Sequence, residues 1–253
     1  MAEPLRALDR IDVAPRFTGA DVAALNARFD AAPTAQMVRE VLREGLLGKV
    51  ALVSSFGAES AVLIHLVVEA GSDTDILFLD TGKHFAETLA YRDTLASHLD
   101  FTPVNLQPDP DSLAARDETG LRWSYDPDGC CEIRKVLPLE QALGAYDASI
   151  TGRKGFQSGT RSGLARFELD GATGRIKWNP LASWTKPELD AYFEAHALPR
   201  HPLEAQGYLS IGCAPCTSKV APGEDPRSGR WKGWDKVECG IHVPLTPGEE
   251  PAF

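Results

Sequence analysis

The chain has 253 residues, which is enough for one large hydrophobic core, or one core with a small appendage. Its composition, 43% hydrophobic and 25% charged, is that of an ordinary soluble globular protein and excludes the disordered and fibrous classes. No apolar run approaches the ~20 residues of a membrane helix, and a net charge of −10 argues against an extended nucleic-acid surface.

The first residues, MAEPLRALDRIDV, lack the basic start and apolar segment of a secretory signal. We therefore expect a cytoplasmic, reducing location. In such a compartment cysteines are more often metal ligands or catalytic groups than disulfide partners. The five cysteines of this chain are accordingly candidates for chemistry.

Predicted helices and strands alternate through the first part of the chain. Apolar residues recur at helical spacing in 21–30 and 35–46. Strands are then predicted at 50–53, 76–79, 101–106 and 148–151, and helices at 60–70, at 84–98 and from about Cys130. This alternation indicates an α/β fold with a parallel sheet that helices cover on both faces.

The pattern changes after Gly163. The stretches LARFELD and GRIKWNP alternate apolar and polar residues around the turn GATG, which predicts a β-hairpin. Thr185 and Glu188 form a predicted capping box at the start of a further helix. From Pro199 onward the chain is rich in Gly and Pro and has little periodicity, so we expect an irregular, mobile C-terminal segment.

The whole chain, 1–253, is interpreted as a single domain, because it has no internal repeats and no linker between two large domains. We divide it into N-terminal helices (1–47), a core that binds the ligands (48–220) and a C-terminal segment (221–253). The sequence leaves open whether the chain forms a homo-oligomer.

The motif SSFGAES directly follows the first predicted strand. Ser54 and Ser55 end the strand, Gly57 supplies a turn, and the next helix is expected to begin near Ser60. The N-terminus of a helix presents unpaired N–H groups and a partial positive charge, so this arrangement suits an anion. It is not a Walker A loop, because no Gly-Lys-Ser/Thr follows. Strand–turn–helix units with serines also occur without a bound anion, and the motif alone does not decide between the two.

Four of the cysteines form two close pairs, Cys130-Cys131 and Cys213-x-x-Cys216. Adjacent α-carbons lie ~3.8 Å apart, less than the ~4.4–6.8 Å of an ordinary disulfide, so Cys130 and Cys131 are not expected to pair with each other. Four thiolates can hold zinc or an iron–sulfur cluster. An adjacent pair is awkward for one tetrahedral ion but can serve two irons of a cubane. The spacing therefore favours iron–sulfur over zinc, and buried structural thiols are a third interpretation.

Lys135 follows the adjacent cysteine pair. If the chain is helical from Cys130, Lys135 lies one turn from Cys131 on the same face. A cubane of charge 2+ bound by four thiolates is a net dianion, which a nearby ammonium group stabilises. Lys135 is therefore a candidate for a group beside the cluster.

The fifth cysteine, Cys239, lies outside both pairs in the motif ECGIH, near Lys236 and His242. Cationic neighbours favour the thiolate, which is the nucleophilic form of cysteine. Residues 219–236 carry five basic against three acidic side chains, which suits a small anion better than a polymer. A small buried hydrophobe is the alternative for Cys239, and a solvated charged loop is the alternative for the basic segment.

Seven motifs carry a family resemblance, and they occur in the order SSFGAES, LDTGKHFAET, CCEIRKVLPL, ITGRKGFQSGTR, GYLSIGCAPCT, GEDPRSGRW and ECGIH. Together, from about residue 48 to 242, they resemble the assimilatory adenylyl-sulfate (APS) reductases of bacteria, within the phosphoadenylyl-sulfate (PAPS) reductase family. The resemblance implies an adenine nucleotide α-hydrolase-like fold of the PP-loop type. It also implies the reduction of APS to sulfite and AMP in sulfate assimilation and cysteine biosynthesis. The implied reductant is thioredoxin or a glutaredoxin-like protein.

The resemblance further implies a role for each motif residue. A 4Fe–4S cluster is expected on Cys130, Cys131, Cys213 and Cys216. Cys239 is expected to attack the sulfur of APS, so that AMP leaves and thioredoxin releases sulfite from an S-sulfocysteine. Cations are needed there, because both reactants are anions. The expected substrate-binding residues are Ser54, Ser55, Gly57, Ser60, Lys135, Lys154, Arg161, Arg227, Arg230 and His242.

One motif departs from the family pattern. In ITGRKGFQSGTR many members carry a second basic residue and an acidic residue where this chain has Gly155 and Phe156. We therefore expect Lys154 and Arg161 to make more of the contacts from that loop.

Three alternatives remain beside APS reduction. A PAPS reductase belongs to the same family, although members with this four-cysteine set usually use APS. A PP-loop enzyme of tRNA thiolation would normally show a Ser-Gly-Gly-x-Asp-Ser loop and a basic face, and this chain has neither. A redox-sensing cluster or zinc protein without catalysis would leave ECGIH without a purpose.

Overall fold

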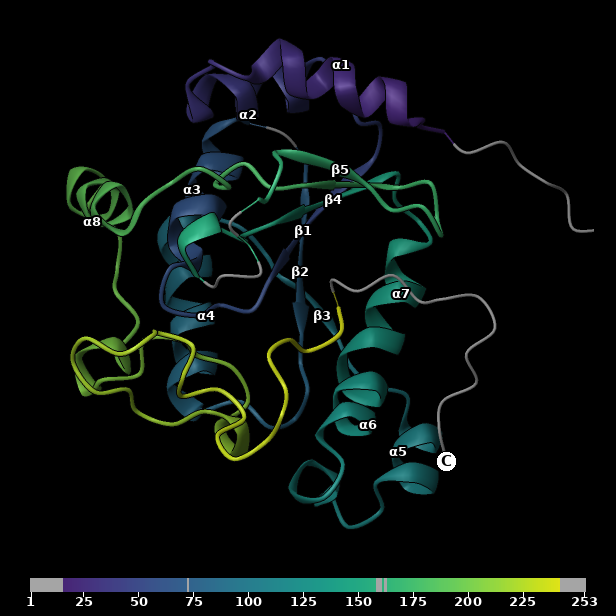
Figure 1. The fold of residues 1–253 in the computed structure, drawn as a ribbon, viewed down its shortest axis with the longest axis vertical. Coiled ribbons are helices and arrows are strands. Elements are labelled where there is room, and N and C mark those ends of the chain that lie inside the picture. Colours follow the sequence, from purple (N-terminus) through teal and green to yellow (C-terminus); the bar gives the residue numbers. More distant parts are fainter. Residues whose placement is uncertain (1–15, 72, 158–160, 162, 242–253) are drawn as a thin grey trace, which may run out of the picture.

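A six-stranded sheet in the order β3-β2-β1-β4-β6-β5 forms the centre of the molecule (Figure 1). The computed structural model describes residues 16–241 except 72, 158–160 and 162. Neighbouring strands are parallel from β3 to β6, and β5 runs antiparallel to β6. The strands are β1 (Val50–Ser54), β2 (Asp75–Leu79), β3 (Val104–Leu106), β4 (Ala148–Thr151), β5 (Phe167–Leu169) and β6 (Ile176–Trp178). The predicted α/β fold and the predicted hairpin are both confirmed.

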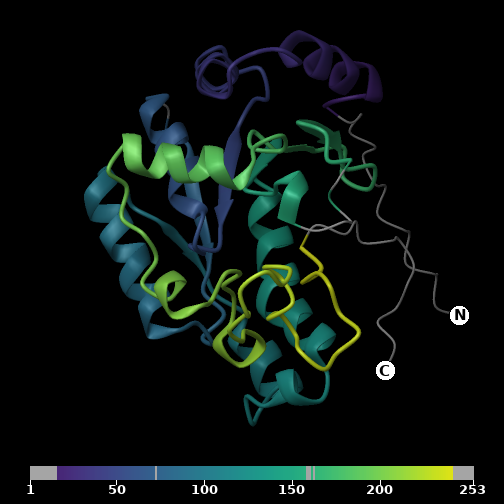
Figure 2. The ribbon, with the colours of Figure 1, turned by 60° about the vertical axis from the view of Figure 1, so that its left-hand side comes forward.

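Helices cover both faces of the sheet, as predicted (Figures 1 and 2). One face carries α3, α4 and α8, and the other carries α5, α6 and α7, while α1 and α2 lie at one end. The helices are α1 (Gly19–Phe29), α2 (Thr34–Arg43), α3 (Ser60–Glu69), α4 (Ala86–Leu99), α5 (Pro110–Arg116), α6 (Pro127–Cys131), α7 (Leu137–Leu143) and α8 (Lys186–Ala195). None of the helices in the described part of the chain is long and apolar enough to cross a membrane.

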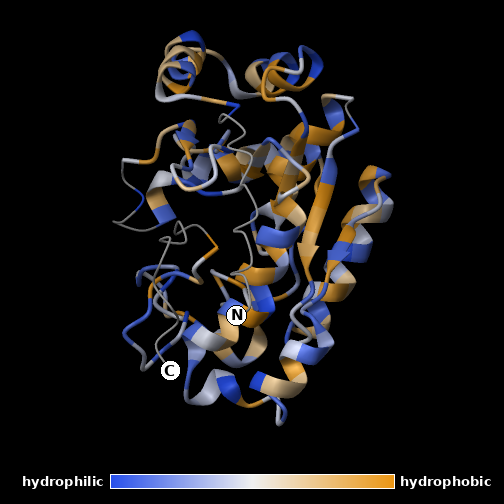
Figure 3. Ribbon diagram, turned by 90° about the vertical axis from the view of Figure 1, so that its right-hand side faces the viewer, coloured by the Kyte–Doolittle hydropathy of each residue, from blue (hydrophilic) through white to orange (hydrophobic). Residues whose placement is uncertain are grey.

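The strands are apolar on both faces because side chains alternate along a strand. In β1, Leu52 belongs to the large core under α3 and α4, and Ala51 belongs to a smaller core with Leu139 and Leu143 of α7. Figure 3 shows the apolar strands between helices with more polar outer surfaces. Two buried layers therefore hold the sheet in place.

Side-chain caps fix where several helices begin. Thr185 and Glu188 form the predicted capping box of α8. The sequence analysis missed α5, although Asp109 caps it by accepting a hydrogen bond of 2.8 Å from the Ser112 amide, with Pro110 at the first position. No residue of α5 is buried, so the helix lacks the apolar periodicity on which the prediction relied.

The strand order reverses between β1 and β4, since β2 and β3 lie on one side of this pair and β6 and β5 on the other. In open α/β sheets such a switch point leaves a crevice at the carboxyl ends of the strands, where ligands bind. The loop that begins at Ser55 and the loop that begins at Gly152 both leave the sheet at this crevice.

The chain from 199 to 241 is irregular, as predicted, apart from the 3₁₀ turns Glu204–Gln206 and Ala214–Cys216. Its start is fixed by His201, which is 1% exposed. Burial lowers the pKa of His201 to about 4, so the neutral ring accepts the Leu203 amide and contacts the Thr88 hydroxyl at 3.1 Å. The mobility of this segment remains a prediction.

Candidate active site

The crevice at the switch point holds a cavity of about 230 Å³. The loop after β1, the loop after β4, Lys135 and the C-terminal segment all contribute to its lining. The expected substrate-binding residues that line the cavity are Ser54, Ser55, Gly57, Ser60, Lys135, Lys154, Arg161, Arg227 and Arg230, and Cys239 lines it as well. His242 lies outside the described residues.

The loop after β1 is folded by its own side chains. The Ser54 hydroxyl accepts a hydrogen bond from the Phe56 amide at 3.1 Å, and the Ser60 hydroxyl donates one to the Gly57 carbonyl at 2.8 Å. Phe56 has a positive φ of 48° and is fully buried, with its ring edge-on to Phe78. The strained Phe56 backbone is thus held by core packing, and the loop that leads into the N-terminus of α3 is preformed.

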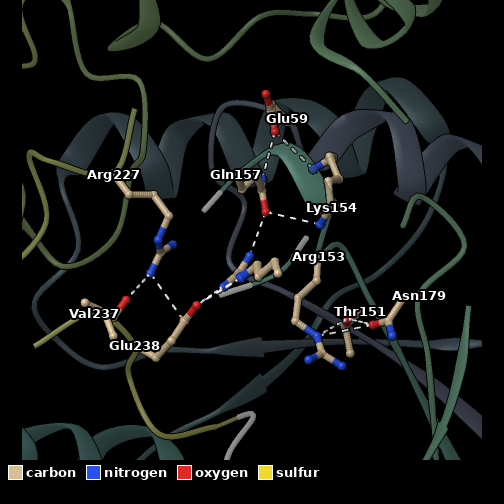
Figure 4. Close-up of polar contacts among 10 residues, drawn as sticks. Glu59, Thr151, Arg153, Lys154, Gln157, Asn179, Arg227, Val237 and Glu238 are labelled. Atoms are coloured by element: carbon tan, nitrogen blue, oxygen red, sulfur yellow. Dashed lines mark hydrogen bonds and ion pairs between the residues drawn. The ribbon is translucent and has the colours of Figure 1, made fainter. Parts of the chain in front are cut away.

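The loop after β4 holds a buried lysine that is already paired. Lys154 is 3% exposed, and its ammonium lies 3.0 Å from the Glu59 carboxylate and donates to the Gly152 carbonyl at 2.9 Å. Gln157 donates to the same carboxylate at 3.0 Å (Figure 4). Burial lowers the pKa of Lys154, and Glu59 opposes that effect. Lys154 therefore lies in the cavity wall as half of an ion pair.

Glu238, the residue before Cys239, connects two arginines of the cavity. Arg161 donates to one of its carboxylate oxygens at 2.9 and 2.6 Å. Arg227 donates to the other oxygen at 3.2 Å and to the Val237 carbonyl at 2.7 Å (Figure 4). These contacts tie the C-terminal segment to the loop after β4 and hold Cys239 beside the cavity.

Lys135 lies between the paired cysteines and Cys239. Burial alone would lower the pKa of Lys135, but the thiols of Cys213, Cys239 and Cys131 raise it above its ordinary value. The turn that carries Lys135, Glu132–Val136, is wound as a π-helix, in which the Leu137 amide bonds to the Glu132 carbonyl. Lys135 and Cys131 influence each other's pKa. The α-helical spacing assumed from the sequence is replaced by a π turn, a feature often found at functional sites, so a shared helix face for the two residues stays a prediction.

The four cysteines of the two pairs gather beside the cavity. Cys130, Cys131 and Cys213 are buried, Cys216 is partly exposed, and all four are free thiols. Burial raises the pKa of Cys130 to about 11, and negative charge on Cys131 and Cys213 adds to the rise. Burial also raises the pKa of Cys216, again with contributions from Cys213 and Cys131. Cys131 and Cys213 thus lie within electrostatic range of both Cys130 and Cys216.

The surroundings of these thiols suit a negatively charged group. The Thr81 hydroxyl lies 3.3 Å from the sulfur of Cys213, and Lys135 lowers the pKa of that thiol against the effect of burial. Within the described ranges, no three His, Cys, Asp or Glu side chains are arranged as ligands of a single metal ion. An iron–sulfur cluster contributes its own sulfides and spans more space than one ion, so four neighbouring thiols with a cation beside them fit such a cluster.

The sequence analysis assigned no role to several residues that the structure places at the site. Arg134, 7% exposed, pairs with buried Asp117 at 2.6 Å and donates to the Thr81 carbonyl at 2.8 Å, which fixes the helix that carries Cys130. Glu59 and Glu238 both stand inside motifs already recognised. The partners of Glu59 lie 95 or more positions away along the chain, and Arg161, one partner of Glu238, lies 77 positions away. The feature that could have pointed to these two residues is an acidic side chain within a motif that is expected to bind an anion.

Comparisons with known proteins agree with this geometry. Residues 49–219 match the family model of the phosphoadenosine phosphosulfate reductase domain. The adenosine 5'-phosphosulfate reductase of Mesorhizobium japonicum is 46% identical over 244 residues, which cover 96% of this chain and 95% of the relative. The chain therefore belongs to the phosphoadenosine phosphosulfate reductase family.

Two further proteins that this chain resembles are named as reductases of PAPS rather than of APS. The phosphoadenosine 5'-phosphosulfate reductase of Gloeobacter violaceus is 41% identical over 218 residues, 85% of this chain and 90% of the relative. A crystal structure of PAPS reductase from Candida auris, in a phosphate complex, superposes with a TM-score of 0.66 at 25% identity. The superposition covers 81% of this chain and 98% of the Candida auris chain. The fold and the family are shared across both names.

We predict that Gly212→Ala weakens anion binding at the cavity. A methyl group on Gly212 would overlap the guanidinium of Arg230, the far end of a flexible side chain that can move without unfolding the protein. The Kd for AMP, measured by calorimetry, should rise by about tenfold, as expected for the loss of one charge-assisted hydrogen bond. Gly171→Ala is the control, because a methyl group there meets no atom within 4 Å. An unchanged Kd in Gly212→Ala would show that Arg230 does not contact the anion.

Proposed function

We propose that this protein reduces adenylyl sulfate (APS) to sulfite and AMP, with thioredoxin or a glutaredoxin-like protein as the electron donor. The observation that carries the proposal is the position of Cys239, which lines the same cavity as the preformed loop after β1 and the cations Lys135, Arg161, Arg227 and Arg230. A nucleophile, an anion-binding loop and cations at one point are the parts that transfer of a sulfur group to a thiol requires.

In the proposed reaction the thiolate of Cys239 attacks the sulfur of APS. A bond forms between the two sulfur atoms, the bond from sulfur to the bridging oxygen breaks, and AMP leaves with that electron pair. A thiolate of the reductant then attacks the cysteine sulfur, which releases sulfite and leaves a mixed disulfide. The second thiol of the reductant resolves this disulfide, so the two electrons come from one dithiol.

The cations offset the repulsion between two anionic reactants. Lys135 lies close to Cys239 and to the paired cysteines, so its ammonium is placed to stabilise negative charge on the attacking sulfur and on the sulfate. Arg230 lines the same wall and lies over the ring of Trp231, which limits the directions that its guanidinium can take. The loop after β1 and the N-terminus of α3 are suited to the phosphate of the nucleotide.

Cys130, Cys131, Cys213 and Cys216 are proposed to hold one 4Fe–4S cluster. When bound, such a cluster would supply a fixed, net negative group beside Lys135. Thr81 and Lys135 would then remain as donors to the thiolate of Cys213, as their contacts with this sulfur suggest.

APS is the proposed nucleotide, because Arg153 and Lys154, two basic residues of the loop after β4, are already paired with carboxylates. Lys154 is paired with Glu59, and Arg153 is paired with Glu168 and also bonds to the Asn179 side chain at 3.2 Å. The second phosphate of PAPS would need a free cation, and these two residues do not offer one. PAPS is the alternative substrate, since relatives named for both nucleotides share the fold.

We propose a cytoplasmic location for the enzyme.

The proposed reaction predicts a trapped covalent adduct. The native protein, given APS without a reductant, should gain the mass of one SO₃ group on the peptide that contains Cys239, and thioredoxin should release it as sulfite. Cys239→Ser should fold, still bind APS and lose all turnover, because a hydroxyl is almost wholly protonated near neutral pH. Peptide mass spectrometry checks both forms. An adduct on any other cysteine, or activity in the serine variant, would refute the mechanism.

The cluster proposal predicts a brown protein with four irons and four labile sulfides per chain when it is purified without oxygen. Cys131→Ser should lose the cluster, because it removes one of the four thiolate ligands. Cys239→Ser is the matched control and should keep full iron content and colour. Iron and sulfide analysis with the visible absorption spectrum decides the question. A colourless preparation that carries one zinc ion, or a full cluster in Cys131→Ser, would contradict the assignment.

A further inference from the structure

The C-terminal segment that carries Cys239 is fixed to the rest of the protein at three points. Lys236 forms an ion pair with Asp128 at the start of α6. Glu238 binds Arg161 and Arg227, and Ile241 packs against the apolar cluster that contains Leu139 and Leu143. Of these anchors, Glu238 is the one whose partners are cations of the cavity wall.

The contact between Glu238 and its two arginines is largely shielded from water. The side chains of Glu238, Arg161 and Arg227 are 22%, 10% and 17% exposed. Each carboxylate oxygen of Glu238 is engaged by a different arginine. Shielding strengthens such contacts beyond those of a surface ion pair. Arg161 belongs to the loop after β4, and Arg227 belongs to the C-terminal segment. Among the described residues, the ion pair of Glu238 with Arg161 is the one that joins this loop to this segment.

We propose that Glu238 is an internal competitor for the substrate's anionic group. In the free protein its carboxylate neutralises Arg161 and Arg227, and the phosphate or sulfate of the nucleotide displaces it when the substrate binds. If a carboxylate and a phosphosulfate bound the same two guanidinium groups, the two anions would lie side by side and repel each other strongly. The exchange couples substrate binding to release of the residue next to the nucleophile. The proposal rests on the proposed function, because it assumes that the cavity binds an adenine nucleotide.

This arrangement has a physical purpose for the positioning of Cys239. Without substrate, Glu238 keeps the two arginines neutralised and holds Cys239 at the cavity. With substrate, the anchor at Glu238 is lost while those at Lys236 and Ile241 remain. Cys239 then stays close to the cavity on a segment that is more loosely held, as it must be if a protein reductant is to reach the modified cysteine. By thermodynamic linkage, weakening the internal contact must tighten the binding of the anion.

The test compares the binding of AMP by the wild-type protein and by Glu238→Gln. Binding is measured by calorimetry on folded protein that has been purified without oxygen. Glutamine keeps the shape of the side chain and removes its charge. We expect the Kd for AMP to fall by about three- to tenfold in Glu238→Gln, the range expected for removal of a partly shielded competing carboxylate. The Kd for adenosine, which has no anionic group, should not change. A purely structural role for Glu238 would weaken binding or leave it unaltered.

Asp235→Asn is the matched control, because Asp235 is an exposed acidic residue three positions earlier in the same segment. It removes the same charge and should leave the Kd for AMP unchanged. Inorganic sulfate distinguishes the two anions of the substrate: tighter sulfate binding in Glu238→Gln assigns the arginines to the sulfate, and tighter binding of AMP alone assigns them to the phosphate.

Equal affinity for both AMP and inorganic sulfate in Glu238→Gln and wild type, or equal tightening by Asp235→Asn, would overturn the competition. The proposed function would survive that result, since the wild-type protein would still bind AMP and reduce APS. A wild-type protein that does not bind AMP at all would overturn the proposed function and the competition together.

Discussion

A thiolate that attacks the sulfur of a phosphosulfate must approach a group of its own charge. In this protein the difficulty is greater, because the thiol of Cys131 lies close enough to Cys239, the proposed nucleophile, for the two to repel each other when ionised. Lys135 is half-buried near Cys213, Cys239 and Cys131, and its positive charge is favoured there by all three. The arginines of the loop after β4 and of the C-terminal segment extend this positive region across the cavity. Without such cations a nucleotide anion and a thiolate would not share a space of this size.

The fold brings these charges together from distant parts of the chain. The reversal of strand order between β1 and β4 opens the crevice, and the loops after these two strands form two of its walls. The π-helical turn after α6 places Lys135 on the same side as the paired cysteines. The irregular segment after α8 then returns across the crevice and delivers Cys239. The regular sheet supplies rigidity, and the irregular segment carries Cys239, the proposed nucleophile.

Most of the fold could be predicted from the sequence, because the buried strands and amphipathic helices leave local patterns. The run at 50–53 and the capping box at Thr185 are signals of this kind. The residues that line the cavity could be named from the sequence because they stand in short motifs. Ion pairs between motifs could not: nothing in the sequence indicates that Glu59 neutralises Lys154 or that Glu238 joins Arg161 to Arg227. Such pairs depend on how the elements pack, and they change which cations are free for a ligand.

We conclude that this protein reduces APS in the cavity at the switch point of the sheet. The most direct measurement is the rate of sulfite release by one purified preparation of the protein, supplied with thioredoxin and with either APS or PAPS. We expect sulfite from APS with a higher kcat/KM than from PAPS, because Arg153 and Lys154 of the loop after β4 are already paired with carboxylates. Equal or better kcat/KM with PAPS would contradict the choice of nucleotide, and no sulfite from either would contradict the proposed function itself.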